Sequence, residues 1–177
     1  MECCRGVKTE NGNNVFYGFP KTATSLGQTF SSFALSTQKF SDTTLELDMK
    51  TYKQLRQNSA TNSWESAWVI WRRTDLFHHY YFVLKTSGIE FGKKDTSCNC
   101  EKQVFLKTSS SPTLKLNTWD HVKISSIGKH TTIWLDGVKV VDMDDPSYGS
   151  AADMSGGYIG LYNEDASGAF DKLTLTL

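Results

Sequence analysis

The sequence has few of the residues that mark several common classes of protein. It contains four cysteines and three prolines in 177 residues, and no apolar run approaches the roughly 20 residues that cross a bilayer as a helix. Residues 1–6 also lack the apolar stretch of a signal peptide. We therefore expect no membrane partner. The chain could equally be a domain excised from a longer protein, so its missing signal does not define a compartment.

Neither sign of charge is in excess, because 19 Lys and Arg balance 19 Asp and Glu. This balance removes any whole-molecule argument for nucleic acid or an anionic membrane as a partner, and we expect neither. The distribution is uneven, since basic residues outnumber acidic ones between positions 72 and 107 and acidic residues dominate between 136 and 171. The asymmetry indicates an anion site and a cation site, unless these charges belong to ordinary solvated faces and loops.

The four cysteines form two tight pairs, Cys3 with Cys4 and Cys98 with Cys100. Neither pair has the CxxC spacing of a zinc site, and small secreted scaffolds spread their cysteines more widely. A disulfide between adjacent cysteines is strained, so in an oxidising compartment the first pair would bond to the second. Free thiols are the alternative.

No segment shows a sustained helical stripe, whereas apolar and polar residues alternate repeatedly. The length and the 38% hydrophobic content predict one domain over residues 1–177. The predicted strands cover residues 29–36, 43–50, 67–73, 79–86, 102–108, 120–127, 131–136, 138–142, 158–162 and 169–177. So many short strands in one domain predict an all-β jelly-roll sandwich of two antiparallel sheets.

Several aromatic motifs follow one another in the last two thirds of the chain. They are Trp71-Arg72-Arg73-Thr74-Asp75, His79-Tyr80-Tyr81-Phe82, Trp119-Asp120-His121-Val122, Ile133-Trp134-Leu135-Asp136-Gly137, and Gly157-Tyr158-Ile159-Gly160-Leu161-Tyr162 with Phe170-Asp171. In this order they resemble the laminin G-like and concanavalin A-like jelly-roll domains of glycan-active proteins. The resemblance implies a glycan groove on the concave face of one sheet. It also implies a structural calcium ion (Ca2+) between the last strand and the N-terminal region.

Calcium prefers oxygen ligands and accepts carboxylates together with backbone carbonyls. The resemblance makes Asp171 the expected metal ligand, and the acidic excess near the end of the chain agrees with it. The run Asp142-Met143-Asp144-Asp145 is the competing candidate.

Strand alternation predicts which side chains form the groove. If Arg72 lies opposite Tyr81, Trp71 faces the core, where we also place Trp119. The other face then carries Trp68, Ile70, Arg72, Tyr81, Val83 and Lys85, with His79 at the rim and Trp134, Tyr158 and Tyr162 from neighbouring strands. Aromatic rings can stack on the C–H faces of sugars while polar groups bind the hydroxyls. Trp68, Trp134, Tyr158 and Tyr162 are therefore the predicted substrate-binding residues.

Two kinds of glycan cleavage make different demands on this groove. A hydrolase needs two carboxyl groups across the scissile bond. The segment Glu46-Leu47-Asp48-Met49-Lys50 is the nearest match to the Glu-x-Asp-x-Glu strand of jelly-roll glucanases, but Lys replaces its last Glu. A polysaccharide lyase needs a cation beside the uronate carboxylate and a Tyr or His as base. Arg72, His79, Tyr81 and Lys85 are the candidate catalytic residues for that reaction.

One motif is similar to a strand of jelly-roll alginate and glucuronan lyases, which carry Tyr-x-Lys-x-Gly-x-Tyr-x-Gln. Gly160-Leu161-Tyr162-Asn163-Glu164 matches its second half, whereas Gly156 replaces the catalytic Tyr and Tyr158 replaces the Lys. Tyr81, Tyr158, Tyr162 or a histidine would therefore have to transfer the proton.

The overall pattern is also similar to chlorella-virus domains that degrade the uronate-containing wall of an algal host. We therefore predict a monomeric polysaccharide lyase that cleaves an acidic cell-wall polysaccharide by β-elimination, with an extracellular or virion-associated location. A non-catalytic carbohydrate-binding domain is the alternative, and a glycoside hydrolase is the third interpretation.

Overall fold

The computed structural model describes residues 4–95, 102–149 and 154–177. All regular secondary structure in these ranges is β-strand, and they contain no helix that could span a membrane. The first sheet has seven antiparallel strands in the order β1 (Arg5–Glu10), β2 (Asn13–Gly18), β13 (Ala166–Thr176), β4 (Thr43–Gln54), β9 (Asp120–Ile127), β10 (His130–Leu135) and β11 (Val138–Asp144). The second has six, in the order β3 (Ser31–Leu35), β12 (Tyr158–Glu164), β5 (Ala67–Arg73), β6 (His78–Lys85), β7 (Gly88–Asp95) and β8 (Gln103–Ser109).

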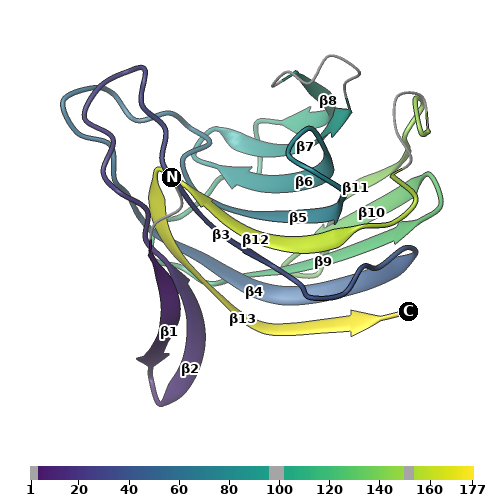
Figure 1. Ribbon diagram of the computed structural model, residues 1–177, viewed down its shortest axis with the longest axis horizontal. Coiled ribbons are helices and arrows are strands. Elements are labelled where there is room, and N and C mark those ends of the chain that lie inside the picture. The colour runs from purple at the N-terminus through teal and green to yellow at the C-terminus, as the bar shows by residue number, and fades with distance from the viewer. Residues whose placement is uncertain (1–3, 96–101, 150–153) are drawn as a thin grey trace.

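The two sheets form the layers of a sandwich, and the β1–β2 hairpin extends beyond its body (Figure 1). Strands β12 and β13 follow each other in the chain but lie in different sheets, as jelly-roll connections require. The predicted all-β jelly roll of two antiparallel sheets is confirmed.

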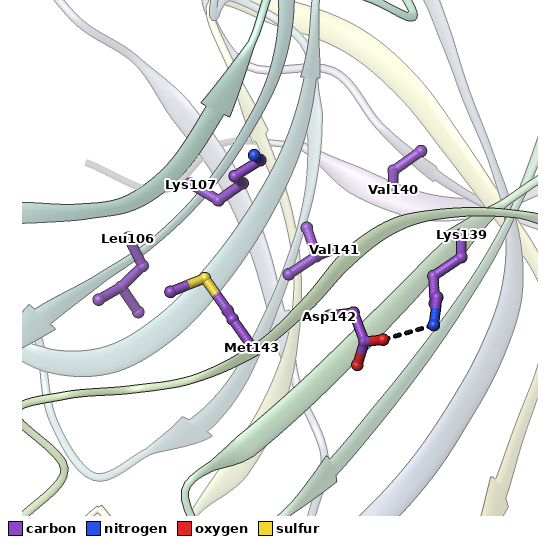
Figure 2. A pocket seen from close by; sticks show the side chains of 7 residues that line it. All are labelled: Leu106, Lys107, Lys139, Val140, Val141, Asp142 and Met143. Carbon is purple, nitrogen blue, oxygen red and sulfur yellow. Dashed lines mark hydrogen bonds and ion pairs between the residues drawn. The ribbon is translucent and has the colours of Figure 1, made fainter.

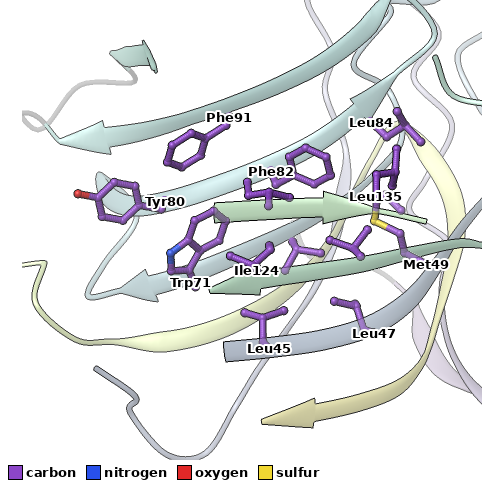
Figure 3. Packing of buried hydrophobic residues seen from close by; sticks show 14 of the residues in the cluster. Leu45, Leu47, Met49, Trp71, Tyr80, Phe82, Leu84, Phe91, Ile124 and Leu135 are labelled. Carbon is purple, nitrogen blue, oxygen red and sulfur yellow. The ribbon is translucent and has the colours of Figure 1, made fainter. Parts of the chain in front are cut away.

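The core lies between the sheets and is filled by the side chains that point inward from the strands of both sheets. Leu45 and Leu47 of β4 have no exposed surface, and they face Trp71 of β5 across the interior (Figure 3). The Trp71 ring stacks with Tyr80 and with Phe91, at centroid distances of 5.9 and 5.8 Å. Stacked aromatic pairs stabilise a core beyond the burial of their area. The prediction that Trp71 lies in the core is therefore confirmed.

Three strands of the structure were not predicted. Strands β1 and β2 form a largely exposed hairpin, so apolar alternation is weak there. Strand β7 carries glycines and charges that argue against a strand in the sequence. At Gly92 a side chain would collide with the Tyr81 ring and with the Val104 carbonyl, so the strand needs glycine at this position to pack against β6.

The cysteines fall mainly outside the described residues. Cys4 is disulfide-bonded, which excludes a free thiol at that position. Cys3, Cys98 and Cys100, on which the predicted pairing depends, lie outside the described ranges.

Candidate functional site

The outer face of the six-stranded sheet carries a cluster of aromatic side chains. Trp68 contacts Tyr81 and Tyr162, with ring centroids 5.2 and 5.7 Å apart, and Phe33 packs edge-on against Tyr162 at 5.7 Å. Ile70 lies opposite Tyr81 in the β5–β6 register, two residues from the predicted pairing, so the alternation is unchanged. The structure therefore brings Trp68, Tyr81 and Tyr162 to one face, as predicted.

A cavity of about 320 Å³ opens beside this cluster. We call it the groove; its lining residues are Ser63, Trp64, Trp68, Lys85, Glu90, Lys94, Gln103, Phe105 and Glu164. Trp64 and Phe105 are 43% and 60% exposed, so two aromatic rings stand in solvent within its lining. The Trp68 indole donates a hydrogen bond to the Trp64 carbonyl at 2.9 Å. The groove thus combines aromatic surfaces with amines, carboxylates and an amide.

Two carboxyl groups in the groove have different environments. Glu90 accepts hydrogen bonds from the Tyr81 hydroxyl at 3.0 Å and from the Lys85 ammonium at 2.6 Å. Glu164 lies two residues after Tyr162, whose hydroxyl donates to it at 2.7 Å. Burial raises the pKa of Glu164 above its usual value, and the Asp165 carboxylate raises it further. Glu164 therefore has the environment of a proton acceptor tuned toward neutral pH.

A buried ion network fixes the backbone behind the groove. The Arg56 guanidinium bridges Glu65 and Asp165, and the three charged side chains are at most 2% exposed. It also donates to the Ser25 and Gln28 carbonyls at 2.8 and 3.0 Å. Glu65 follows Trp64 and Asp165 follows Glu164 in the chain. Arg56 consequently connects the two segments that present Trp64 and Glu164 to the groove.

Arg72 does not lie where the alternation predicted. Its backbone has a φ of 49°, which breaks the regular alternation of side chains near the end of β5, and the side chain is 1% exposed. The guanidinium donates to the Gly128 and Ser126 carbonyls of the other sheet at 2.7 and 3.2 Å, and to Asp42 at 2.9 Å. The expected place of Arg72 in the groove is therefore wrong, because the left-handed backbone turns the residue toward the opposite sheet.

His79 and Tyr81 are more buried than the sequence suggested. Burial, followed by the charges of Lys94 and Arg73, lowers the pKa of His79 to about 3. Burial raises the pKa of Tyr81 well above its usual value, and Glu90 adds to that effect. The Tyr81 hydroxyl donates a hydrogen bond to Glu90 and not to a group near Arg72. Lys85 does line the groove, as predicted.

Three of the four predicted substrate-binding residues are not part of the groove lining: Tyr162, which lies next to it through its hydrogen bond to Glu164, and Trp134 and Tyr158, which lie farther away. Trp134 is on β10 of the seven-stranded sheet, so its predicted place beside Trp68 is wrong. Tyr158 lies opposite Arg73 at the start of β12, with the Lys39 ammonium 5.5 Å from its ring centroid. Trp119, expected in the core, is half-buried and lines a separate cavity of about 240 Å³.

Asp171 lies on the outer face of the seven-stranded sheet and reaches the N-terminal hairpin. Its carboxylate accepts hydrogen bonds from the Asn13 side chain at 2.5 Å and from the Lys172 amide at 2.8 Å. Within the described ranges, no group of three or more His, Cys, Asp or Glu side chains is arranged to hold a metal ion. The residues present therefore do not form a ready calcium site, and the ion stays a prediction.

Sequence reasoning missed Trp64, Glu90, Lys94 and Glu164. Glu164 could have been found, because residues two apart on a strand share a face and Tyr162 was already placed there. Glu90 and Lys94 were missed because their strand β7 was not predicted.

A larger cavity of about 380 Å³ lies between β8 and β11, at the open edges of the two sheets. Figure 2 shows Leu106, Val141 and Met143 gathered at its apolar side. Its acid, Asp142, pairs with Lys139 (Figure 2). Asp142 is the one acid among these lining residues, and it is already paired, so the groove with its two carboxyl groups is the better candidate for chemistry.

A family model described as 3-keto-alpha-glucoside-1,2-lyase-like domain matches residues 5–176. Carbohydrate-binding module CBM66 from Bacillus subtilis has a TM-score of 0.64 at 22% identity, over 90% of this chain and 92% of that one. A GH16 protein of Bacteroides ovatus, solved with the product G4G4G3G, has a TM-score of 0.65 at 11% identity, over 97% and 85% of the two chains. At such identities these structures establish the fold alone. No curated protein sequence matches the chain.

Proposed function

The chain belongs to the family of 3-keto-alpha-glucoside-1,2-lyase-like domains, and we propose that it is a carbohydrate lyase that cleaves a 3-keto-glycoside by β-elimination in the groove. The observation that carries this proposal is Glu164, a carboxyl group with a raised pKa in an aromatic-lined cavity. Such a group is a stronger base than an ordinary carboxylate. The sugar-binding character of the groove follows from Trp64 and Trp68.

In the proposed reaction, a carbonyl at C3 acidifies the proton at C2, and Glu164 accepts that proton. The electron pair of the C2–H bond forms the C1=C2 double bond, and the C1–O bond breaks. Glu164 then returns the proton to the departing oxygen. The ammonium groups of Lys85 and Lys94 line the same cavity and can donate hydrogen bonds to the enolate oxygen at C3.

The charge of the groove favours a neutral keto sugar over the uronate that the sequence suggested. Lys85 and Lys94 are balanced by Glu90 and Glu164, and Lys85 is already paired with Glu90. Arg72, the expected partner of a uronate carboxylate, is bound to Asp42 and to backbone carbonyls of the other sheet. The elimination chemistry is the same for both sugars, since each begins with a proton next to a carbonyl carbon.

A glycoside hydrolase is the second candidate, because Glu90 and Glu164 line the same cavity. A hydrolase needs one carboxyl group as acid and another as base or nucleophile. Glu90 already accepts hydrogen bonds from Lys85 and Tyr81, which suits a supporting role better. Glu46 and Asp48, the nearest match to a glucanase motif, lie on the other sheet and pair with Lys123 and Lys172.

The test uses p-nitrophenyl 3-keto-α-glucoside and follows both p-nitrophenol release and the sugar product. Elimination yields an unsaturated keto sugar that absorbs in the ultraviolet, whereas hydrolysis yields 3-ketoglucose without the double bond. Glu164→Gln should lower turnover by about 10²–10⁴-fold, the usual contribution of general base catalysis. The control Glu46→Gln changes a half-buried carboxyl on the other sheet and should retain activity.

Three outcomes would overturn the proposal of a 3-keto-glycoside lyase. Release of 3-ketoglucose would identify a hydrolase. An ultraviolet signal from polyuronates alone would restore the uronate substrate. Sugar binding without turnover of either substrate would identify a carbohydrate-binding domain.

A further inference from the structure

Trp134 was singled out by the sequence, but the proposed reaction gives it no role. It lies on the outer face of the seven-stranded sheet, opposite Lys123 of β9, and both flanking residues, Ile133 and Leu135, point into the core. His121 and Lys123 share that outer face, with side chains 47% and 41% exposed. Trp119 precedes His121 by two residues, so alternation brings it to the same side.

Two shallow cavities flank this row of side chains. One, of about 340 Å³, is lined by His121, Lys123, Trp134 and Gly137. The other, of about 240 Å³, includes Trp119 and Asp48 in its lining. The His121–Asp48 pair, 2.8 Å apart, lies between them. A tryptophan therefore borders each cavity, and polar groups separate the two rings.

The charged groups along this face balance one another. Lys123 pairs with Glu46 at 2.6 Å, and Asp48 pairs with both His121 and Lys172 at 2.8 and 2.7 Å. These pairs offer hydrogen-bond donors and acceptors without a strong field of one sign. Such a surface suits hydroxyl groups better than it suits a polyanion or a polycation.

We propose that this face is a second binding site, which binds a neutral polysaccharide chain. We call it the strip; it is defined by Trp119, His121, Lys123 and Trp134. Trp119 directly precedes β9, and Trp134 lies opposite Lys123, four residues farther along the chain. In an extended chain this separation is about 13 Å at 3.3–3.4 Å per residue. That span is long enough for a short run of sugar rings. The aromatic rings stack on C–H faces, and the ion pairs between them bind hydroxyl groups.

The strip and the groove lie on opposite sides of the sandwich, because one belongs to the seven-stranded sheet and the other to the six-stranded sheet. Packed sheets are about 10 Å apart, and side chains add to that separation. One sugar unit therefore cannot occupy both sites. The strip holds the protein on a polymer while the groove stays accessible, and it does so whether or not the groove is catalytic.

Affinity electrophoresis in native gels that contain soluble mixed-linkage β-glucan tests the proposal. Wild-type protein should be retarded, and Trp134→Ala should weaken the retardation at least tenfold in apparent affinity. Trp119→Ala should act in the same direction. The matched control Leu173→Ala removes a 43% exposed side chain of β13 in the same sheet and should leave retardation unchanged.

The groove variant Trp68→Ala separates this proposal from the proposed lyase function. Retention of binding by Trp68→Ala and its loss by Trp134→Ala, with unchanged melting temperature, supports the strip. Loss of binding only in Trp68→Ala places all glucan recognition in the groove and overturns the strip. Equal retardation of wild type and Trp134→Ala, or no retardation of wild type, also overturns it. Turnover of the small 3-keto-glucoside by Trp134→Ala should match wild type. Glucan retardation therefore tests the strip, and turnover of the small substrate tests the lyase function independently.

Discussion

Acid should destabilise this protein partly through one buried histidine. His79 is 6% exposed, and its Nδ1 atom has no hydrogen-bond partner within the described part of the chain. Burial and the neighbouring Lys94 and Arg73 lower the pKa of His79 to about 3, whereas a histidine in an unfolded chain titrates near pH 6.5. Between these values the unfolded chain binds a proton that the folded protein does not. Stability is therefore lost as the pH falls below about 6.5.

The size of the effect follows from the two pKa values. One pKa unit corresponds to about 1.4 kcal/mol. Lowering the pH from 8 to 4.5 takes the unfolded histidine about two units below its pKa, which costs about 2.7 kcal/mol of the free energy of unfolding. Domains of this kind are stable by about 5–15 kcal/mol, so His79 alone removes a large share.

Urea unfolding at pH 8 and pH 4.5, followed by tryptophan fluorescence, measures this contribution. In His79→Gln the loss of stability between the two pH values should be smaller than in wild type by about 2.7 kcal/mol. His130→Gln is the control, because Asp144 and Asp142 raise the pKa of the exposed His130. The His130→Gln substitution should therefore increase the loss of stability between pH 8 and pH 4.5. Equal losses in wild type and His79→Gln would refute the reasoning.

Three further predictions concern buried charges and calcium. Burial and the nearby Asp136 raise the pKa of Asp120 to about 6, so its contribution to stability is lost as the pH rises through 6. In urea unfolding, Asp120→Asn should therefore have a free energy of unfolding higher than wild type by up to about 3 kcal/mol at pH 8, and equal to wild type at pH 3.5. Arg56→Leu leaves Glu65 and Asp165 buried without their partner and should lower the unfolding free energy by about 3–5 kcal/mol, whereas a loss below 1 kcal/mol would contradict that role. Excess calcium should raise the melting temperature of wild type but not of Asp171→Ala; identical curves with calcium and with chelator would remove the proposed ion.

Apart from Arg72, the faces of the side chains on strands β5 and β6 could be predicted because a strand alternates its side chains with a period of two. The alternation around Trp71 and Tyr80 assigned the core face and placed Trp68 and Tyr81 on the other face, although the true register is shifted by two residues. A register shift by an even number of residues leaves each side chain on the same face of the sheet. The aromatic composition of that face could therefore be predicted from the sequence.

The site chemistry was less predictable, because it depends on residues that are distant in sequence. Glu164 gains its raised pKa from burial beside other strands, and Lys85 meets Glu90 only because β6 and β7 form a hairpin. Nothing in the local sequence marks such desolvation, since the surrounding side chains come from several elements.

The sequence by itself determined ten of the thirteen described strands, the sandwich class and most of the inward and outward faces, because these depend on local periodicity and on burial of apolar residues. The tertiary structure alone decided which sheet each strand joined. That choice put Trp134 on the opposite side from Trp68, and a left-handed backbone at Arg72 directed its guanidinium across the sandwich. Sheet membership depends on long-range pairing between strands, and a two-residue alternation carries no information about the partner.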